Sequence, residues 1–319
     1  MIRKLALLLI FCLLLAGCRT PEPLAREGVA MDTVVKITLY DSRDTAVTDT
    51  CFSKIRAYEA LFSRTDQNSE VSLLNVAGGN AVSLSPAVRD LLTLGKSWGE
   101  RTDGAFDLTI APVSSLWDFA AGVRPDDDAL RQAATLVDYT ALTVTETGAQ
   151  LPGGMAVDLG GIAKGYVADR LGEYLRSAGV NSALIDLGGN IVAVGNKDGK
   201  PFSVGVRDPF DETALAAVIP AENVSVVTSG VYERRFTHEG VTYHHILDPA
   251  TGMPVQNGLA SVTIVSSSSA DGDALSTACF VMGLEKGMAL IERLDGVEAL
   301  FITDDGVLHP STGLSYEPR

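Results

Sequence analysis

The chain has 319 residues, of which 46% are hydrophobic and 20% charged, and its formal net charge is −15. A chain of this length and hydrophobicity can bury a large core, either as one domain or as two lobes that share it. The acidic balance, with no basic stripe along the sequence, argues against nucleic acid as a partner. An acidic protein that binds phosphates usually does so through a metal ion.

The N-terminus predicts export and lipidation. Arg3 and Lys4 precede the apolar run LALLLIFCLLLAG, which suits the core of a signal peptide and is short for a membrane span. The run ends in LAGC, which resembles the bacterial lipobox, in which the cysteine becomes the lipidated first residue. We therefore expect a signal peptide over 1–17, a lipidated tether over 18–28 beginning at Cys18, and one domain over 29–319. A plain signal peptide with an incidental cysteine is the alternative.

This N-terminus implies a protein that is exported and anchored to a bacterial membrane by lipid, facing the periplasm or another extracytoplasmic space. Loss of the two positive charges in the signal would make the mature chain −17.

Helices and strands are both predicted along the rest of the chain. Residues 34–42 alternate like a strand, 47–65 has apolar residues at helical spacing, and 69–78 is interpreted as a turn. Residues 85–102 predict a helix with a serine cap and a proline in its first turn. The later predictions are an irregular segment over 104–120, a short helix over 126–137, a strand over 154–159, a helix over about 162–178, a strand over 182–187, a strand meander through 202–249, a long helix over 273–294 and a hairpin over 298–310. Together they indicate an α+β fold with mixed or antiparallel sheets flanked by helices.

Two cysteines would remain in the mature chain besides Cys18. Cys51 lies in a helical pattern and Cys279 in an apolar one, so two buried thiols are expected. A disulfide between them is the alternative for an exported protein.

Residues 156–170, AVDLGGIAKGYVADR, join the predicted strand to the predicted helix through two glycines. A helix start offers free N–H groups and the positive end of its dipole, and glycine permits close approach, so the junction suits a phosphate. It matches neither G-x-x-x-x-G-K-[ST] nor G-x-G-x-x-G. DLGG recurs at 186–189, which suggests two glycine-rich strand ends side by side. A connection that binds nothing is the alternative.

Polar residues gather in three further motifs. In YHHILDPATG, His244 and His245 would point to opposite faces of a strand, so only one can face a site; a tight turn would explain the rest. In SADGDALSTA, Asp273 and Thr277 share a helical face, which suits Mg²⁺ or Ca²⁺, while capping of a helix by Asp273 is the alternative. The hydroxyls of TSG at 228–230 suit a base or ribose, or a turn.

The order of these motifs resembles the FAD:protein FMN transferase family, known as ApbE. The succession is the lipobox, MDTVVKITLY, SEVSLLN, GAFDLTIAP, DLGGIAKGYVAD, IDLGGN, TSGVYERRF, HHILDPATG and DALSTACFVMG, over about residues 28–310. The resemblance implies a Mg²⁺-dependent enzyme that moves FMN from FAD, its substrate, to a Thr or Ser hydroxyl of an exported flavoprotein and releases AMP.

The same resemblance implies the residues of the site. The metal ligands would be the carbonyl of Gly161, the carboxylate of Asp273 and the hydroxyl of Thr277. His245 matches the family's His-x-x-Asp-Pro and is the candidate general base. The residues that would contact FAD are Met31, Ala105, Phe106, Asp107, Asp158, Lys164, Thr228, Ser229, His245 and Ile246.

Three positions depart from the family pattern or vary within it. Asp32 stands where glycine usually follows the methionine, Thr65 falls where an aromatic residue is often found, and other members carry glutamate in place of Lys164. Two rival functions stay open at this point: hydrolysis of FAD to FMN and AMP, and binding of FAD without turnover.

Overall fold

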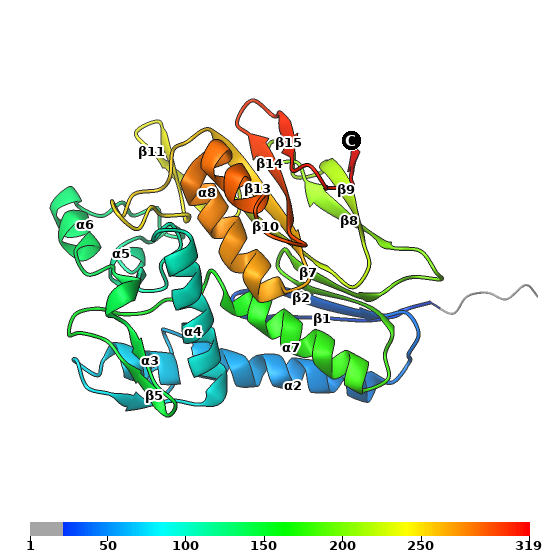
Figure 1. The fold of residues 1–319 in the computed structure, drawn as a ribbon, viewed down its shortest axis with the longest axis horizontal. Helices are drawn as coiled ribbons and strands as arrows, with labels where there is room; N and C mark the ends of the chain where they lie inside the picture. Colours follow the sequence, from blue (N-terminus) through cyan, green and yellow to red (C-terminus); the bar gives the residue numbers. More distant parts are fainter. Residues whose placement is uncertain (1–21) are drawn as a thin grey trace, which may run out of the picture.

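The computed structural model describes residues 22–319, so the predicted signal peptide and Cys18 lie outside the described residues. A central sheet of eight strands has the order β1-β2-β6-β7-β10-β13-β14-β15 (Figure 1). Every neighbouring pair in it is antiparallel. The strands are β1 Leu24–Ala30, β2 Thr33–Leu39, β6 Ser182–Leu187, β7 Asn190–Gly195, β10 Ser225–Gly230, β13 Leu259–Ser266, β14 Glu298–Thr303 and β15 Leu308–Pro310.

Smaller antiparallel sheets surround the central one. One has the order β16-β9-β8, another β3-β5-β4, and β11 and β12 form a hairpin that stands apart. Their strands are β3 Val82–Ser83, β4 Thr143–Val144, β5 Gly148–Gln150, β8 Phe202–Arg207, β9 Leu215–Ala221, β11 Arg235–His238, β12 Val241–His244 and β16 Glu317–Pro318.

Two long helices cover one face of the central sheet (Figure 1). α7 (Ala163–Ser177) packs on β6 and β7, and α8 (Ser269–Ile291) packs on β10 and β13. The β8–β9 hairpin covers the other face, where Val204 and Ile219 belong to one buried cluster with Ile302 of β14. The molecule is therefore layered as helices, sheet and hairpin. The remaining helices are α2 Thr45–Phe62, α3 Glu70–Asn75, α4 Pro86–Arg101, α5 Ala111–Ser114, α6 Asp127–Ala134 and a 3₁₀ turn at Tyr139–Ala141.

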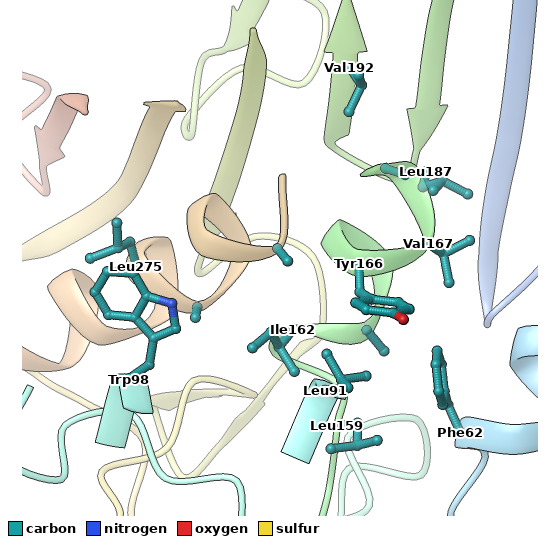
Figure 2. Close-up of a cluster of buried hydrophobic side chains, with 14 of the residues drawn as sticks. Phe62, Leu91, Trp98, Leu159, Ile162, Tyr166, Val167, Leu187, Val192 and Leu275 are labelled. Carbon is teal, nitrogen blue, oxygen red and sulfur yellow. The ribbon is translucent and has the colours of Figure 1, made fainter. Parts of the chain in front are cut away.

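The start of α7 is anchored in the main core. Leu159 and Ile162, on either side of the Gly160–Gly161 pair, are both buried, and Figure 2 shows them among Leu91 and Tyr166. Because apolar side chains hold both flanks, the glycine backbone between them is fixed relative to α7.

Gly165 lets α7 and α8 meet at their first turns. A Cβ atom on Gly165 would lie 2.2 Å from the carbonyl oxygen of Ser269, far inside van der Waals contact. Glycine is therefore required where the two helix starts touch.

The predicted α+β class is confirmed, with helices on antiparallel sheets. Three local predictions are wrong. Leu24–Gly28 belongs to β1 rather than to a flexible tether, because it pairs with β2 through the turn at Met31–Asp32. Part of 69–78 forms α3, because the Ser69 side chain accepts a hydrogen bond from the Ser72 N–H and caps a short helix.

The predicted strand over 154–159 does not form. Ala156 makes an isolated bridge to Ile110, and the backbone of Val157 is bound by the side chain of Asn75. The first DLGG therefore follows an extended segment, and only the second forms a turn between paired strands, β6 and β7.

The two thiols are free and buried, as expected, and burial raises the pKa of Cys51 and of Cys279 to about 12. Among residues 22–319, α8 alone is long and apolar enough to cross a membrane. Its apolar composition is explained by its place on the sheet, where Ala274, Leu275 and Phe280 are fully buried.

Candidate active site at the starts of two helices

The proposed metal ligands lie at the starts of α7 and α8. A Cβ atom on Gly161 would lie 3.6 Å from the Thr277 hydroxyl oxygen and 3.2 Å from the ring of Phe106. Gly161, Thr277 and Phe106, from three separate segments, thus meet at one point. Any larger residue at 161 would fill the space between them.

Asp273 caps a helix, but not its own. The N-cap of α8 is Ser268, whose side chain accepts from the Asp271 N–H, so Asp273 lies inside the helix. Its Oδ2 accepts a 3.0 Å hydrogen bond from the Gly165 N–H in the first turn of α7. Its side chain is only 5% exposed, so the carboxylate is fixed at the junction of the two helices.

Asp169 makes the reciprocal contact and was not predicted from the sequence. From α7 it accepts hydrogen bonds from the N–H groups of Ser269 and Ala270, at 2.8 and 2.9 Å, and from the hydroxyl of Ser268. Burial raises the pKa of Asp169, and these hydrogen bonds oppose the rise. Each helix therefore supplies an acid to the first turn of the other: Asp169 binds two N–H groups of α8, and Asp273 binds one of α7.

Lys164 stands beside the same carboxylate. Its Nζ is 3.8 Å from Asp273 Oδ1 and 3.4 Å from the Gly160 carbonyl oxygen. No other cationic side chain of residues 22–319 lies within ion-pair distance of Asp273.

Asp158, predicted to contact FAD, is already held by the protein. Its Oδ2 accepts from the Ser114 hydroxyl at 2.9 Å and lies 3.2 Å from Arg64 Nε, and its Oδ1 accepts from the Gly160 N–H. Arg64 and Ser114 were missed from the sequence, because neither lies in a recognised spacing with Asp158.

Asn75, the last residue of the SEVSLLN motif, holds the backbone of Val157. Its side-chain amide donates to the Val157 carbonyl at 2.9 Å and accepts from the Val157 N–H at 2.7 Å. This two-bond clamp takes the place of a strand partner and fixes the chain immediately before Asp158.

Two of the residues expected to contact the flavin, Met31 and Asp107, already make hydrogen bonds within the protein. Met31 lies in the β1–β2 turn with φ 53°, and its N–H donates to Glu59 Oε1. The Asp107 carboxylate is buried and accepts from the Thr109 N–H and hydroxyl and from the Tyr139 N–H. Burial raises its pKa against those hydrogen bonds. Its oxygens are therefore occupied by its own loop and by the 3₁₀ turn at Tyr139, whereas the Phe106 ring reaches Gly161.

Thr228 and Ser229 point to opposite faces of β10. The Ser229 hydroxyl lies 2.8 Å from that of Ser276 on α8, whereas the Thr228 hydroxyl pairs with Thr263 of β13 at 2.9 Å. Only Ser229 therefore faces the layer that holds Asp273.

The paired histidines have different surroundings. His244 is buried, with Nε2 donating to the Val255 carbonyl and Nδ1 accepting from the Ile246 N–H, so both nitrogens serve the fold. His245 Nδ1 is buried without a hydrogen-bond partner in the described structure. The Ile246 side chain, also predicted to line the cofactor pocket, is buried in the main core.

Burial, followed by the charges of Arg234 and Lys164, lowers the pKa of His245 to about 3. The His245 N–H, immediately after β12, donates to the carbonyl of Arg234, immediately before β11, at 3.1 Å. A neutral imidazole with two cations nearby can accept a proton close to a bound anion.

The donor set fits a hard cation shared with a phosphate. Within residues 22–319, no group of three or more His, Cys, Asp or Glu is placed to hold a metal. One carboxylate, one hydroxyl and one carbonyl leave positions that phosphate oxygens or water must fill, which is how Mg²⁺ is usually bound. These donors would suit a phosphate site completed by a cation at two helix starts.

Known proteins share this architecture. A FAD:protein FMN transferase of Treponema pallidum is 36% identical over 315 residues, covering 91% of this chain and 87% of the relative. One of Klebsiella pneumoniae is 37% identical over 302 residues, covering 92% and 93%. The crystal structure of the ApbE protein of Thermotoga maritima has a TM-score of 0.85 at 30% identity, covering 91% of this chain and 97% of that one.

The apo form of the Pseudomonas stutzeri flavinyl transferase ApbE has a TM-score of 0.81 at 29% identity, covering 91% and 95%. The model of the ApbE family matches residues 31–301. The chain therefore belongs to the ApbE family.

Proposed function

We propose that the chain is an FAD:protein FMN transferase, which moves FMN from FAD to a Thr or Ser hydroxyl of another exported protein and releases AMP. The relatives that share more than four-fifths of its length carry that name. The observation that supports it best is the approach of Gly161 to the Thr277 hydroxyl, one helical turn after Asp273, whose carboxylate binds the first turn of α7.

In this proposal the Gly161 carbonyl, the Asp273 carboxylate and the Thr277 hydroxyl hold Mg²⁺ against the diphosphate of FAD. The bound ion would neutralise charge on the phosphates and on the leaving AMP. The N–H groups at the α7 start and the Lys164 ammonium add positive charge at the same place.

The transfer forms one bond and breaks one. The acceptor hydroxyl oxygen attacks the phosphorus of the FMN half, and the bond from that phosphorus to the bridging oxygen breaks, so AMP leaves with the oxygen. His245 accepts the hydroxyl proton. Its lowered pKa keeps it neutral in the free protein, and the anionic diphosphate would raise that pKa toward the range of an effective base when FAD binds.

We further propose that Cys18 is lipidated and that the mature protein is tethered outside the cytoplasm. The tether is short, because strand β1 begins at Leu24. Such an anchor would keep the enzyme where exported flavoproteins mature.

The test is direct. The chain from residue 19 is incubated with FAD, Mg²⁺ and an acceptor peptide that contains Thr, and the peptide is weighed by mass spectrometry. A mass gain equal to FMN that EDTA abolishes is the expected result. Release of FMN and AMP without an adduct would indicate a hydrolase, and unchanged bound FAD would indicate a binding protein.

A further inference from the structure

Lys164 occupies an unusual place for a phosphate-binding lysine, because its ammonium faces a carboxylate. Nζ lies 3.8 Å from Asp273 Oδ1, on the oxygen that the Gly165 N–H does not use. Asp273 is the carboxylate assigned to the metal. Two cations, one from the protein and one from solution, therefore compete for the same oxygen.

We propose that Lys164 is an internal counter-cation that holds Asp273 when the metal is absent and leaves it for the FAD diphosphate when the metal binds. This inference rests on the proposed function and deepens it, since it makes binding of the metal and of FAD cooperative.

Burial is the first reason. The Asp273 side chain is 5% exposed, and a buried carboxylate needs a compensating charge. The Gly165 N–H satisfies only Oδ2, which leaves Oδ1 to Lys164. Without the lysine, the metal-free site would contain an uncompensated negative charge.

The second reason is that the contacts between Lys164 Nζ and its two oxygen neighbours are long. Charge-assisted N–H to O hydrogen bonds are about 2.7–2.9 Å long, and both contacts of Lys164 Nζ are longer. The side chain is 25% exposed and sits on a flexible four-carbon stem. It can therefore move without disturbing α7.

The third reason is that the diphosphate is proposed to bind within reach of the Lys164 ammonium. Lys164 lies in the first turn of α7, next to Gly160 and Gly161, where the diphosphate is proposed to bind. A divalent cation at Asp273 repels the ammonium, whereas the phosphates attract it. A metal that arrives alone would push the lysine away from Asp273 with only the Glu233 carboxylate and solvent to receive it, whereas a metal that arrives with FAD would also offer it the diphosphate.

The expected consequence is reciprocal. Lys164 weakens metal binding in the free enzyme, and FAD removes that penalty, so each ligand raises the affinity for the other by the same factor. The lysine thus makes the enzyme select the metal–FAD pair over the metal alone.

The experiment measures Mn²⁺ binding by electron paramagnetic resonance, with the full chain in detergent. Wild type, Lys164→Met and Lys164→Gln are titrated with and without FAD, and the FAD samples are frozen within seconds. Without FAD, both variants are expected to bind Mn²⁺ at least fivefold more tightly than wild type. The factor by which FAD enhances Mn²⁺ binding is expected to fall to a similar extent.

Lys286→Met is the matched control, because it removes one positive charge from an exposed position in the second half of α8. Its Mn²⁺ affinity should equal that of wild type. Unchanged or weaker Mn²⁺ binding by both Lys164 variants without FAD, or an undiminished FAD enhancement, would overturn the inference while leaving the transferase proposal intact. A wild-type chain that binds no Mn²⁺ in either condition would refute the metal site itself, which the mass-spectrometric assay would report separately.

Discussion

The proposed metal side of the site is built from two helix starts, whereas the proposed flavin side is built from turns. Asp273 binds one N–H group in the first turn of α7, and Asp169 binds two in the first turn of α8, so the positions of Gly161 and Thr277 follow from how α7 and α8 pack. On the proposed flavin side, Met31 lies in a two-residue turn, and the Asp107 carboxylate binds its own loop and the 3₁₀ turn at Tyr139. The difference indicates that a metal position demands a rigid frame, while a ring surface can be lined by loops that vary between relatives.

The largest effect is expected on the metal side. Asp273→Asn removes the one carboxylate assigned to the metal and should lower the rate of FMN transfer roughly a thousandfold, because a bound cation supplies several kcal/mol of charge stabilisation. The rate is measured by mass spectrometry of the acceptor peptide.

The matched control is Asp271→Asn, two residues earlier on α8, where the carboxylate accepts from Trp98 Nε1. Its transfer rate should stay within a few-fold of wild type. Equal rates for the two variants would remove Asp273 from the metal site.

The second effect concerns stability. Asp169→Ala leaves the Ser269 and Ala270 N–H groups without partners in a buried place and should lower the free energy of unfolding by about 3 kcal/mol. Asp126→Ala removes an exposed cap from α6 and should cost about 1 kcal/mol. Urea denaturation of the metal-free proteins compares them, and equal losses would contradict the interlocked helix starts.

The third effect depends on pH. His245 has a native pKa of about 3 against 6.5 for the free side chain, so below pH 6.5 the unfolded chain binds a proton that the native chain does not. The free energy of unfolding should therefore fall as the pH is lowered from 6.5 toward 3. His245→Gln should reduce this loss, as measured by urea denaturation at pH 7 and pH 5.

His238→Gln, on the exposed hairpin, serves as the control and should keep the wild-type pH dependence. If His245→Gln kept it as well, the imidazole would not be protected from protonation and its role as a neutral base would be lost.

The smallest effect tests the turn side. Asp32 is exposed with φ 57°, a conformation that favours glycine, so Asp32→Gly should raise the free energy of unfolding by about 0.5–1 kcal/mol. The turn after β7 offers the reverse change: Gly199 has φ 78° and open space around it, so Gly199→Asp should cost a similar amount. A loss of stability in Asp32→Gly, measured by thermal or urea denaturation, would show that Asp32 is stabilised by something other than its backbone.

The sequence predicted what local patterns determine. Helices α4 and α7 lie within a residue or so of their expected bounds, because Pro86 begins the first and buried residues at helical spacing run through both. The hairpin of β14 and β15 also follows from its turn residues.

The contacts that build the site could not be predicted in the same way. Asn75 binds Val157 across 82 positions, and Asp169 binds Ala270 across 101, and no periodic pattern records such pairs. The segment before Asp158 resembles a strand in its apolar residues, yet a side chain supplies its backbone hydrogen bonds. The motif order therefore indicated the family and a set of candidate residues, while only the packing of α7 on α8 shows how Asp273 is held.

One measurement tests the central claim most directly: anomalous diffraction from crystals grown with Mn²⁺ and FAD. The account predicts a single strong peak at the start of α7, bound by the Gly161 carbonyl, the Asp273 carboxylate and the Thr277 hydroxyl, with the FAD diphosphate completing its coordination. A peak elsewhere, or FAD bound at this place with Asp273 still paired to Lys164 and no metal, would contradict it.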